Sequence, residues 1–214
     1  MADLLPLFPL GTVLFPGLLL PLQVFEPRYR ALMHDLMAEP PPWSFGVVAI
    51  REGHEVGANS VKSLYDVGCI GVIEQVEQLP DGRFAVLLVG SRKFRVRDLD
   101  ESRLYLRGEV DLIDEPPSAD GPTTLVTTVR ERFADYCSGL GATGIAVPDD
   151  AYTLSHVVAA TMMIPLLEKQ ALLEAADTEQ RLQTEAMMLS RELALIRTGT
   201  MPVAQPRLPP HSQN

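Results

Sequence analysis

The spacing of apolar residues changes along the chain, from a period of two in the first half to a helical period in the second. Residues 104–113 alternate apolar and polar side chains, which predicts a strand with one buried face. Turn-forming residues at 80–82 separate two strand-like runs and predict a hairpin. The apolar run 45–50 and the segment 61–73 predict further strands, so the first half is expected to be rich in β-structure.

Several segments show the apolar spacing of amphipathic helices and are bounded by residues that start or stop helices. A short helix is expected within the first half from Pro27, because proline suits a first helical position and apolar residues follow on one face up to Met37. Asp149 or Asp150, and later Asp177, are expected to cap helices of the second half. The helices predicted there cover residues 125–137, 151–164, 166–175 and 177–198.

These patterns divide the chain into a β-rich unit at residues 1–113 and a helical subdomain at residues 124–198. The proline-rich segment 114–123 is a linker by composition, and the polar tail 199–214 is expected to be disordered. A run of strands followed by a run of helices predicts the α+β class.

The opening segment from Leu4 to Phe25 contains no charged residue and is long enough to span a bilayer as a helix. Prolines interrupt it repeatedly, and each interior proline costs a helix roughly 3 kcal/mol. A secretion signal would begin with positive charge, whereas the charged residue that precedes this segment is Asp3. The segment is therefore predicted to form short extended pieces that the rest of the fold buries, not a membrane anchor.

The acidic balance of the chain narrows the classes of partner. Its 214 residues carry a net charge of −10 at pH 7, which disfavours general binding to nucleic acids and to anionic membranes. Cys69 and Cys137 lie far apart in segments of different character, so a disulfide framework is not expected. A reducing, cytoplasmic location fits this cysteine usage.

Motifs that could carry catalysis fail on their structural context. The GLGATG run at 139–144 matches a dinucleotide-binding pattern, but a predicted helix precedes it instead of a strand. His54 begins a run like that of zinc proteases, but the second histidine is missing. Lys62, Lys93 and Lys169 lie in polar segments where exposure would keep them from acting as bases. We therefore expect no enzymatic activity, no metal and no cofactor.

The segment SRKFRVR contains the main basic cluster of the chain, in which Lys93, Arg95 and Arg97 would form one positive stripe on a strand. Such a stripe could contact phosphates, so an RNA-binding module is an alternative function. The stripe could equally be a solvated strand face, paired with acids such as Glu109 and Asp111 on a neighbouring strand. The absence of interleaved aromatic residues favours this second interpretation.

The segment LPLFPLGTVLFPGLLLPLQVFEPRYRALM resembles the start of the Lon protease N-terminal, substrate-binding domain, and residues 25–29 (FEPRY) are its most specific piece. The segments FGVVAIREGHEVG, VGCIGVIEQVEQLPDGRFAVLLVGSRKFRV and EKQALLEAADTEQRLQ are also similar to that family, so the likeness covers residues 4–197. The chain looks most like bacterial proteins that carry this domain alone. The resemblance implies a PUA-like β pseudobarrel with one helix, followed by an α-helical bundle.

The resemblance also implies a function. In full Lon proteases this domain engages damaged or unfolded substrates, and an ATPase module and a Ser–Lys peptidase module follow it. Neither module is expected within these 214 residues, so proteolysis is not carried over. The expected function is non-enzymatic binding of unfolded or extended polypeptide, or of a partner protein, without nucleic acid or membrane.

The opening segment holds more apolar side chains than a thin barrel wall buries, so some are expected to line an exposed groove for polypeptide. Apolar contact would supply affinity in this groove, and free amides at a sheet edge would supply orientation. The residues expected near the groove are Phe15, Pro16, Leu20, Phe25 and Tyr29. Structural roles are expected for Glu26 at a helix N-terminus, for Pro27 as first helical residue and for Arg28 as a clamp on a neighbouring loop.

Overall fold

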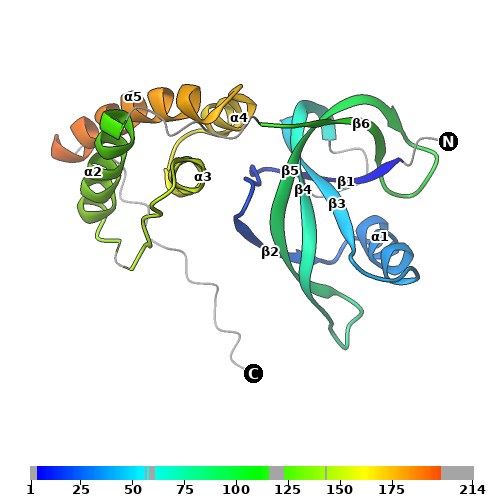
Figure 1. The fold of residues 1–214 in the computed structure, drawn as a ribbon. Helices are drawn as coiled ribbons and strands as arrows, with labels where there is room; N and C mark the ends of the chain where they lie inside the picture. Colours follow the sequence, from blue (N-terminus) through cyan, green and yellow to red (C-terminus); the bar gives the residue numbers. More distant parts are fainter. Residues whose placement is uncertain (1–3, 56, 58–60, 116–122, 143, 199–214) are drawn as a thin grey trace.

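The computed structural model describes residues 4–55, 57, 61–115, 123–142 and 144–198 of the chain. Strands occupy its first half together with one helix, and the remaining described helices follow in the second half (Figure 1). The strands are β1 (Leu5–Leu10), β2 (Leu19–Val24), β3 (Ser44–Gly53), β4 (Val61–Gln78), β5 (Phe84–Asp100) and β6 (Arg107–Ile113). The helices are α1 (Pro27–Met37), α2 (Thr123–Gly139), α3 (Ala151–Thr161), α4 (Leu166–Glu174) and α5 (Thr178–Arg197).

The strands form one mixed sheet in the order β2-β5-β4-β3-β1-β6. β1 pairs with β3 in parallel, and the other pairs are antiparallel. β6 pairs with both β1 and β5, so the ladder from β5 through β4, β3 and β1 to β6 closes on itself. β2 pairs with the first part of β5, and β6 pairs with the second part. The predicted order of a sheet followed by helices is confirmed, while its assignment as a PUA-like pseudobarrel stays a prediction.

Helix α1 closes the β-rich unit through the apolar stripe that its sequence predicts. Tyr29, Leu32 and Met33 are buried on this stripe. The ring of Phe8 from β1 stacks between Tyr29, at 4.1 Å between centroids, and Phe45 of β3, at 5.4 Å. Aromatic pairs at such distances add to the stability gained from burying their area. This packing fixes the start of α1 beside β1 and β3.

Two of the predicted strands have different limits. The strand expected at 61–73 continues to Gln78 as one arm of the predicted β4–β5 hairpin. The strand expected from residue 104 begins instead at Arg107, because an ion pair between Arg107 and Asp100, at 2.5 Å, closes the preceding loop. Ser102 N also donates to Asp100 Oδ1 at 2.9 Å, and Leu104 in this loop is exposed. Residues 104–106 therefore belong to the connection and not to the strand.

The helices of the second half begin at the predicted caps. The side chain of Asp150 accepts a hydrogen bond from Thr153 N at 2.7 Å, and that of Asp177 accepts one from Gln180 N at 2.8 Å. An N-cap of this kind stabilises a helix by about 1 kcal/mol. Helix α3 is shorter than predicted and ends at Thr161.

The largest apolar cluster spans the strands and the helices. Val13, Phe15, Ala49 and Val67 from the β-rich unit are buried in the same cluster as apolar residues of α2, α3, α4 and α5. In Figure 1, α2, α3, α4 and α5 stand together on one side of the sheet, away from α1. The position of the helices relative to the sheet is thus set by a shared core.

The predicted linker and tail lie mostly outside the described residues, at 116–122 and 199–214. Asp114 and Glu115 are described, and the side chain of Glu115 is buried, so packed structure continues into the predicted linker. None of the helices in the described ranges combines the length and the apolar character that a membrane crossing requires.

Candidate functional site

Two residues predicted to line a groove, Phe15 and Pro16, are buried. Phe15 is 1% exposed, and its ring centroid lies 6.1 Å from that of His156 on α3. Pro16 is buried as well. The chain here lies so close to β5 that a Cβ added at Gly90 would meet the carbonyl oxygen of Phe15 at 2.1 Å. The predicted place of Phe15 and Pro16 in a surface groove is therefore wrong, because both residues are buried.

The other predicted groove residues do not meet in one place. Leu20 faces inward from β2 and is half-buried against the core. Phe25 is exposed just after β2, whereas the side chain of Tyr29 on α1 is buried. Phe25 and Tyr29 line one small hollow of about 50 Å³, which does not include Leu20.

The FEPRY segment holds a neighbouring loop in place. Arg28 Nη2 lies 3.1 Å from Glu26 Oε2 and also donates to the carbonyl oxygen of Glu55, in the loop between β3 and β4, at 3.1 Å. The Arg28 guanidinium lies 4.5 Å above the centroid of the Tyr29 ring, a cation–π arrangement. Burial raises the pKa of Tyr29 to about 12, so its hydroxyl stays neutral. Arg28 thus contacts the loop that it was expected to clamp.

A larger hollow of about 330 Å³ also has Tyr29 in its lining. Its lining includes exposed Leu104 and the cations Arg28, Lys62 and Arg103. Two of these cations already have acidic partners, since Arg28 pairs with Glu26 and Arg103 lies 3.1 Å from Asp35. The hollow therefore has no strong net charge to select a ligand.

A more extended apolar surface covers the outer face of β2, β5 and β4. Along β5, buried Phe84, Val86 and Leu88 alternate with half-buried Ala85, Leu87 and Val89. A solvated sheet face normally carries polar residues at such outward positions. Strand register sets three rows across this face, which we call the β2–β5–β4 patch. Its rows are Leu19–Val89–Val72, Pro21–Leu87–Gln75 and Gln23–Ala85–Glu77.

The β2–β5–β4 patch is hollowed. A depression of about 660 Å³ is lined by its second and third rows and by Leu22, Val86 and Val76, which form the row between them. These three residues point inward, so their backbone forms the floor of the depression. The small side chain of Ala85 keeps the third row low at its centre. The hollow thus runs across the strands and can accept side chains of a bound segment.

One border of the patch is a sheet edge, because β2 pairs only with β5 within the described part of the chain. Gly90 N donates to the carbonyl oxygen of Leu18 at 2.9 Å, which sets the alternation of the ladder. The amides of Leu19 and Gln23 therefore point away from β5. Pro21 between them has no amide hydrogen, as is typical of an edge strand.

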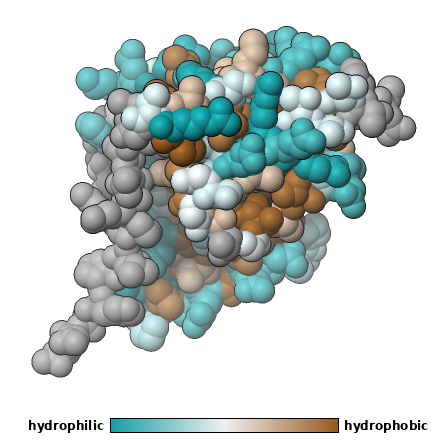
Figure 2. Space-filling view, turned by 90° about the vertical axis from the view of Figure 1, so that its left-hand side faces the viewer, coloured by the Kyte–Doolittle hydropathy of each residue, from teal (hydrophilic) through white to brown (hydrophobic). Residues whose placement is uncertain are grey.

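Apolar exposure also occurs on the helices. Figure 2 views the molecule from their side and shows apolar side chains gathered near the middle of this face, with hydrophilic side chains around them. Leu140 in the loop after α2, and Met187 and Leu195 on α5, are exposed apolar residues. Apolar exposure is therefore not confined to the β2–β5–β4 patch.

The predicted basic stripe is not formed. Lys93 is buried with 4% of its side chain exposed, which contradicts the expectation that it lies at the surface. Arg97 forms an ion pair with Asp111 of β6, the acidic partner expected for a solvated strand face. The structure therefore leaves no continuous row of free cations along this part of β5.

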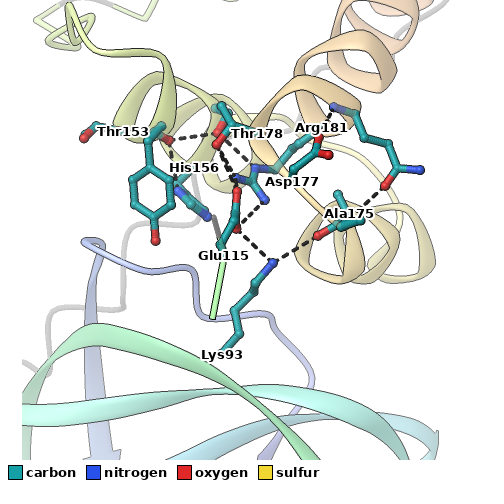
Figure 3. Close-up of polar contacts among 12 residues, drawn as sticks. Lys93, Glu115, Thr153, His156, Ala175, Asp177, Thr178 and Arg181 are labelled. Atoms are coloured by element: carbon teal, nitrogen blue, oxygen red, sulfur yellow. Dashed lines mark hydrogen bonds and ion pairs between the residues drawn. The ribbon is translucent and has the colours of Figure 1, made fainter. Parts of the chain in front are cut away.

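Lys93 belongs to a buried ionic cluster between β5 and the helices, which we call the junction cluster: Lys93, Glu115, Ser155, Thr178 and Arg181 (Figure 3). Lys93 Nζ lies 2.9 Å from Glu115 Oε2 and donates to the carbonyl oxygen of Ala175 at 3.0 Å. Arg181 forms an ion pair with Glu115 and donates through Nε to Ser155 Oγ at 2.9 Å. The cluster joins β5, the segment after β6, α3 and α5.

Electrostatics in and around the junction cluster keep Glu115 charged and His156 neutral. Burial raises the pKa of Glu115, but hydrogen bonds and charge from Arg181 and Lys93 outweigh it and lower the pKa to about 2. Burial, followed by the charge of Arg181, lowers the pKa of His156 to about 3. Burial also raises the pKa of Glu185 on α5 well above its usual value.

The described residues offer little for catalysis. They contain no group of three or more His, Cys, Asp or Glu residues arranged to hold a metal ion. Lys169 is half-buried, not exposed as predicted, and its Nζ donates to the carbonyl oxygen of Ala160 at 2.8 Å. Burial lowers its pKa. Lys93 is held by Glu115, so both of these lysines have structural contacts.

A model of the ATP-dependent protease La (LON) substrate-binding domain family matches residues 4–191. The Lon protease 2 of Herpetosiphon aurantiacus is 28% identical over 90% of this chain, and that of Thermus thermophilus is 29% identical over 92%. The chain spans about a quarter of these relatives, 24% and 25% of their lengths.

Solved structures agree with this match. The crystal structure of a Lon N-terminal domain protein from Xanthomonas campestris has a TM-score of 0.66 at 27% identity, and the alignment covers 88% of this chain and 98% of that one. The N-terminal domain of a Mycobacterium avium complex Lon protease has a TM-score of 0.61 at 17% identity with the same coverage, which supports the fold.

Proposed function

Because the chain belongs to the ATP-dependent protease La (LON) substrate-binding domain family, we propose that it binds unfolded or extended segments of protein chains and does not cleave them. The observation that supports this proposal most directly is the apolar outer face of the β2–β5–β4 patch. A surface patch of this kind is typical of sites for protein partners. The relatives are full-length Lon proteases, whereas the matched family model describes the substrate-binding domain.

The patch can supply affinity through apolar contact. Leu19 is 61% exposed, and Leu87 and Val89 beside it on β5 are half-buried. Complete burial of a leucine side chain is worth about 1.5–3 kcal/mol, so covering the exposed part of Leu19 is worth roughly 1–2 kcal/mol. Where a bound segment reaches the β2 border of the patch, the outward amides of Leu19 and Gln23 can orient it through main-chain hydrogen bonds.

The expectation that the chain does not cleave what it binds rests on its lysines. In a serine–lysine pair the lysine must lie beside the serine as a neutral base. Lys93 is held by the carboxylate of Glu115, and Lys169 by the carbonyl oxygen of Ala160. Lys62 lies exposed on β4, where its charge is solvated. These contacts support a binding role without hydrolysis.

The test is a titration of the 214-residue chain into a fluorescently labelled, permanently unfolded polypeptide, followed by anisotropy. Saturable binding is expected, and Leu19→Asp should weaken it roughly 5–30-fold, which corresponds to the 1–2 kcal/mol above. Leu104→Asp is the matched control, because Leu104 is a leucine that is 77% exposed in the hollow beside Tyr29. Circular dichroism should show that both variants remain folded.

Each result decides a separate point. Lack of saturable binding by the unchanged chain would overturn the proposed function. Binding that Leu104→Asp weakens and Leu19→Asp does not would place the site in the hollow beside Tyr29. Met187→Asp on α5 tests the helical face in the same way, because Met187 is also exposed.

A further inference from the structure

The hollow of the β2–β5–β4 patch has two unlike walls. The wall formed by Pro21, Leu87 and Gln75 is mainly apolar, whereas the wall formed by Gln23, Ala85 and Glu77 ends in a carboxylate on β4. Neighbouring strands lie about 4.8 Å apart, so Glu77 is one strand from Ala85 and two strands from Gln23. A segment that lies across the strands would meet apolar side chains along its length and an acid at the β4 end.

The carboxylate of Glu77 is available for a partner. Glu77 is exposed, and its side chain has no ion pair or hydrogen bond with the residues that the structure describes. Lys, Arg and His are absent from the described lining of the hollow. Arg83, which follows in the hairpin, lies 2.6 Å from Asp81 and already has an acidic partner. The formal charge of the hollow is therefore negative.

The low profile of Ala85 gives a bound side chain a path to this carboxylate. Lysine and arginine can lay their aliphatic stems along an apolar surface while the charged end reaches a polar group. A stem that crosses Ala85 would bring its cation toward Glu77, with Leu87 on the neighbouring row. An acidic side chain in the same place would meet like charge.

Building on the proposed function, we infer that the patch selects apolar segments that carry a basic residue at one end and disfavours those that carry an acidic residue there. Glu77 is the residue that determines this preference. The partner is thus an extended polypeptide segment with apolar side chains flanked by lysine or arginine. An exposed ion pair adds little to affinity, so the preference is a modest selectivity superimposed on apolar binding.

The test compares three capped, labelled peptides with the same apolar centre, flanked at both ends by Lys, by Gln or by Glu. At low ionic strength the Lys-flanked peptide should bind the unchanged protein about 2–5-fold more tightly than the Gln-flanked one, and the Glu-flanked peptide should bind more weakly than both. Glu77→Lys should reverse this order and leave the affinity of the Gln-flanked peptide unchanged. The exposed position of Glu77 makes this substitution compatible with folding.

Glu109→Lys on β6 is the matched control, because it changes the net charge by the same amount at another exposed strand position. The original order of affinities should persist in this variant. A reversal by Glu109→Lys as large as that by Glu77→Lys would show that the net charge of −10 produces the preference, and would overturn the inference. Equal binding of the three peptides to the unchanged protein would overturn it as well. Failure of the Gln-flanked peptide to bind would instead count against the proposed function.

Discussion

Replacement of Glu115 by Gln would remove the only carboxylate of the junction cluster as we define it. Lys93 and Arg181 would then be two buried cations that no longer face an anion, since both pair with Glu115. Their side chains are 4% and 0% exposed, so water cannot replace the lost partner without opening the junction. The glutamine keeps the shape of the side chain, and the change is therefore mainly one of charge.

Two independent arguments give a similar magnitude for Glu115→Gln. Removal of one partner from a buried ion pair costs about 3–5 kcal/mol, because it leaves an uncompensated charge in the interior. The lowering of the Glu115 pKa from 4.5 to about 2 corresponds to roughly 3 kcal/mol of preferential interaction with the charged form. Domains are stable by about 5–15 kcal/mol in total, so the loss is a large share.

Two spectroscopic signals can follow the unfolding of the two halves of the chain separately in urea. Fluorescence of the single Trp43 reports on the β-rich unit, and far-ultraviolet circular dichroism reports mainly on the helices. Glu115→Gln is expected to lower the free energy of unfolding by about 3 kcal/mol in both signals. The control is Asp114→Asn, whose pair with Arg92 has side chains 82% and 50% exposed and is worth at most about 1 kcal/mol. Equal losses in the two variants would refute the reasoning.

Two further predictions concern acidic side chains in the interior. Because Glu115 has a folded pKa of about 2, below its ordinary value of 4.5, its stabilisation should be complete above pH 4.5 and should fade as the pH drops toward 2. The urea midpoint of the unchanged protein should fall over this pH range, and the fall should be smaller in Glu115→Gln. An equal fall in the two proteins would contradict the attribution of this pH dependence to Glu115. Glu185→Met should raise the free energy of unfolding at neutral pH by about 1–3 kcal/mol, because both oxygens of the buried Glu185 lack hydrogen-bond partners within the described residues. A lower thermal midpoint in this variant would contradict that account.

Features determined by neighbouring residues could be predicted from the sequence. Asp150 and Asp177 act as caps because the donors they need lie three residues ahead in the chain. Pro27 begins α1, and the turn at 80–82 joins β4 and β5, for equally local reasons. In each case the physical cause lies within one turn of helix or one hairpin.

The junction cluster could not be predicted, because its causes are distant in the sequence. Glu115 stands in a proline-rich segment that is typical of a linker, and its partner Arg181 lies 66 residues further on. Lys93 stands in a basic run on a strand, and only the packing of the helices against that strand takes it out of water. The sequence shows which groups can ionise but not which ones a later helix will cover.

The binding surface illustrates a different cause of error. The richness of the opening segment in apolar residues suggested a groove there, but Phe15 is buried in the core shared with the helices and Pro16 is buried as well. The stronger indication was in the run 84–89, FAVLLV, where both alternating sets of positions are apolar although this strand has one inward face. An apolar residue at an outward-facing strand position is the better indication of a binding partner, because burial in the protein's own core does not explain it. By this criterion, the opening segment contributes its outward-facing residues Leu19 and Pro21 to the binding surface. They lie on β2, and the outward-facing residues of β5 and β4 form the rest of the β2–β5–β4 patch.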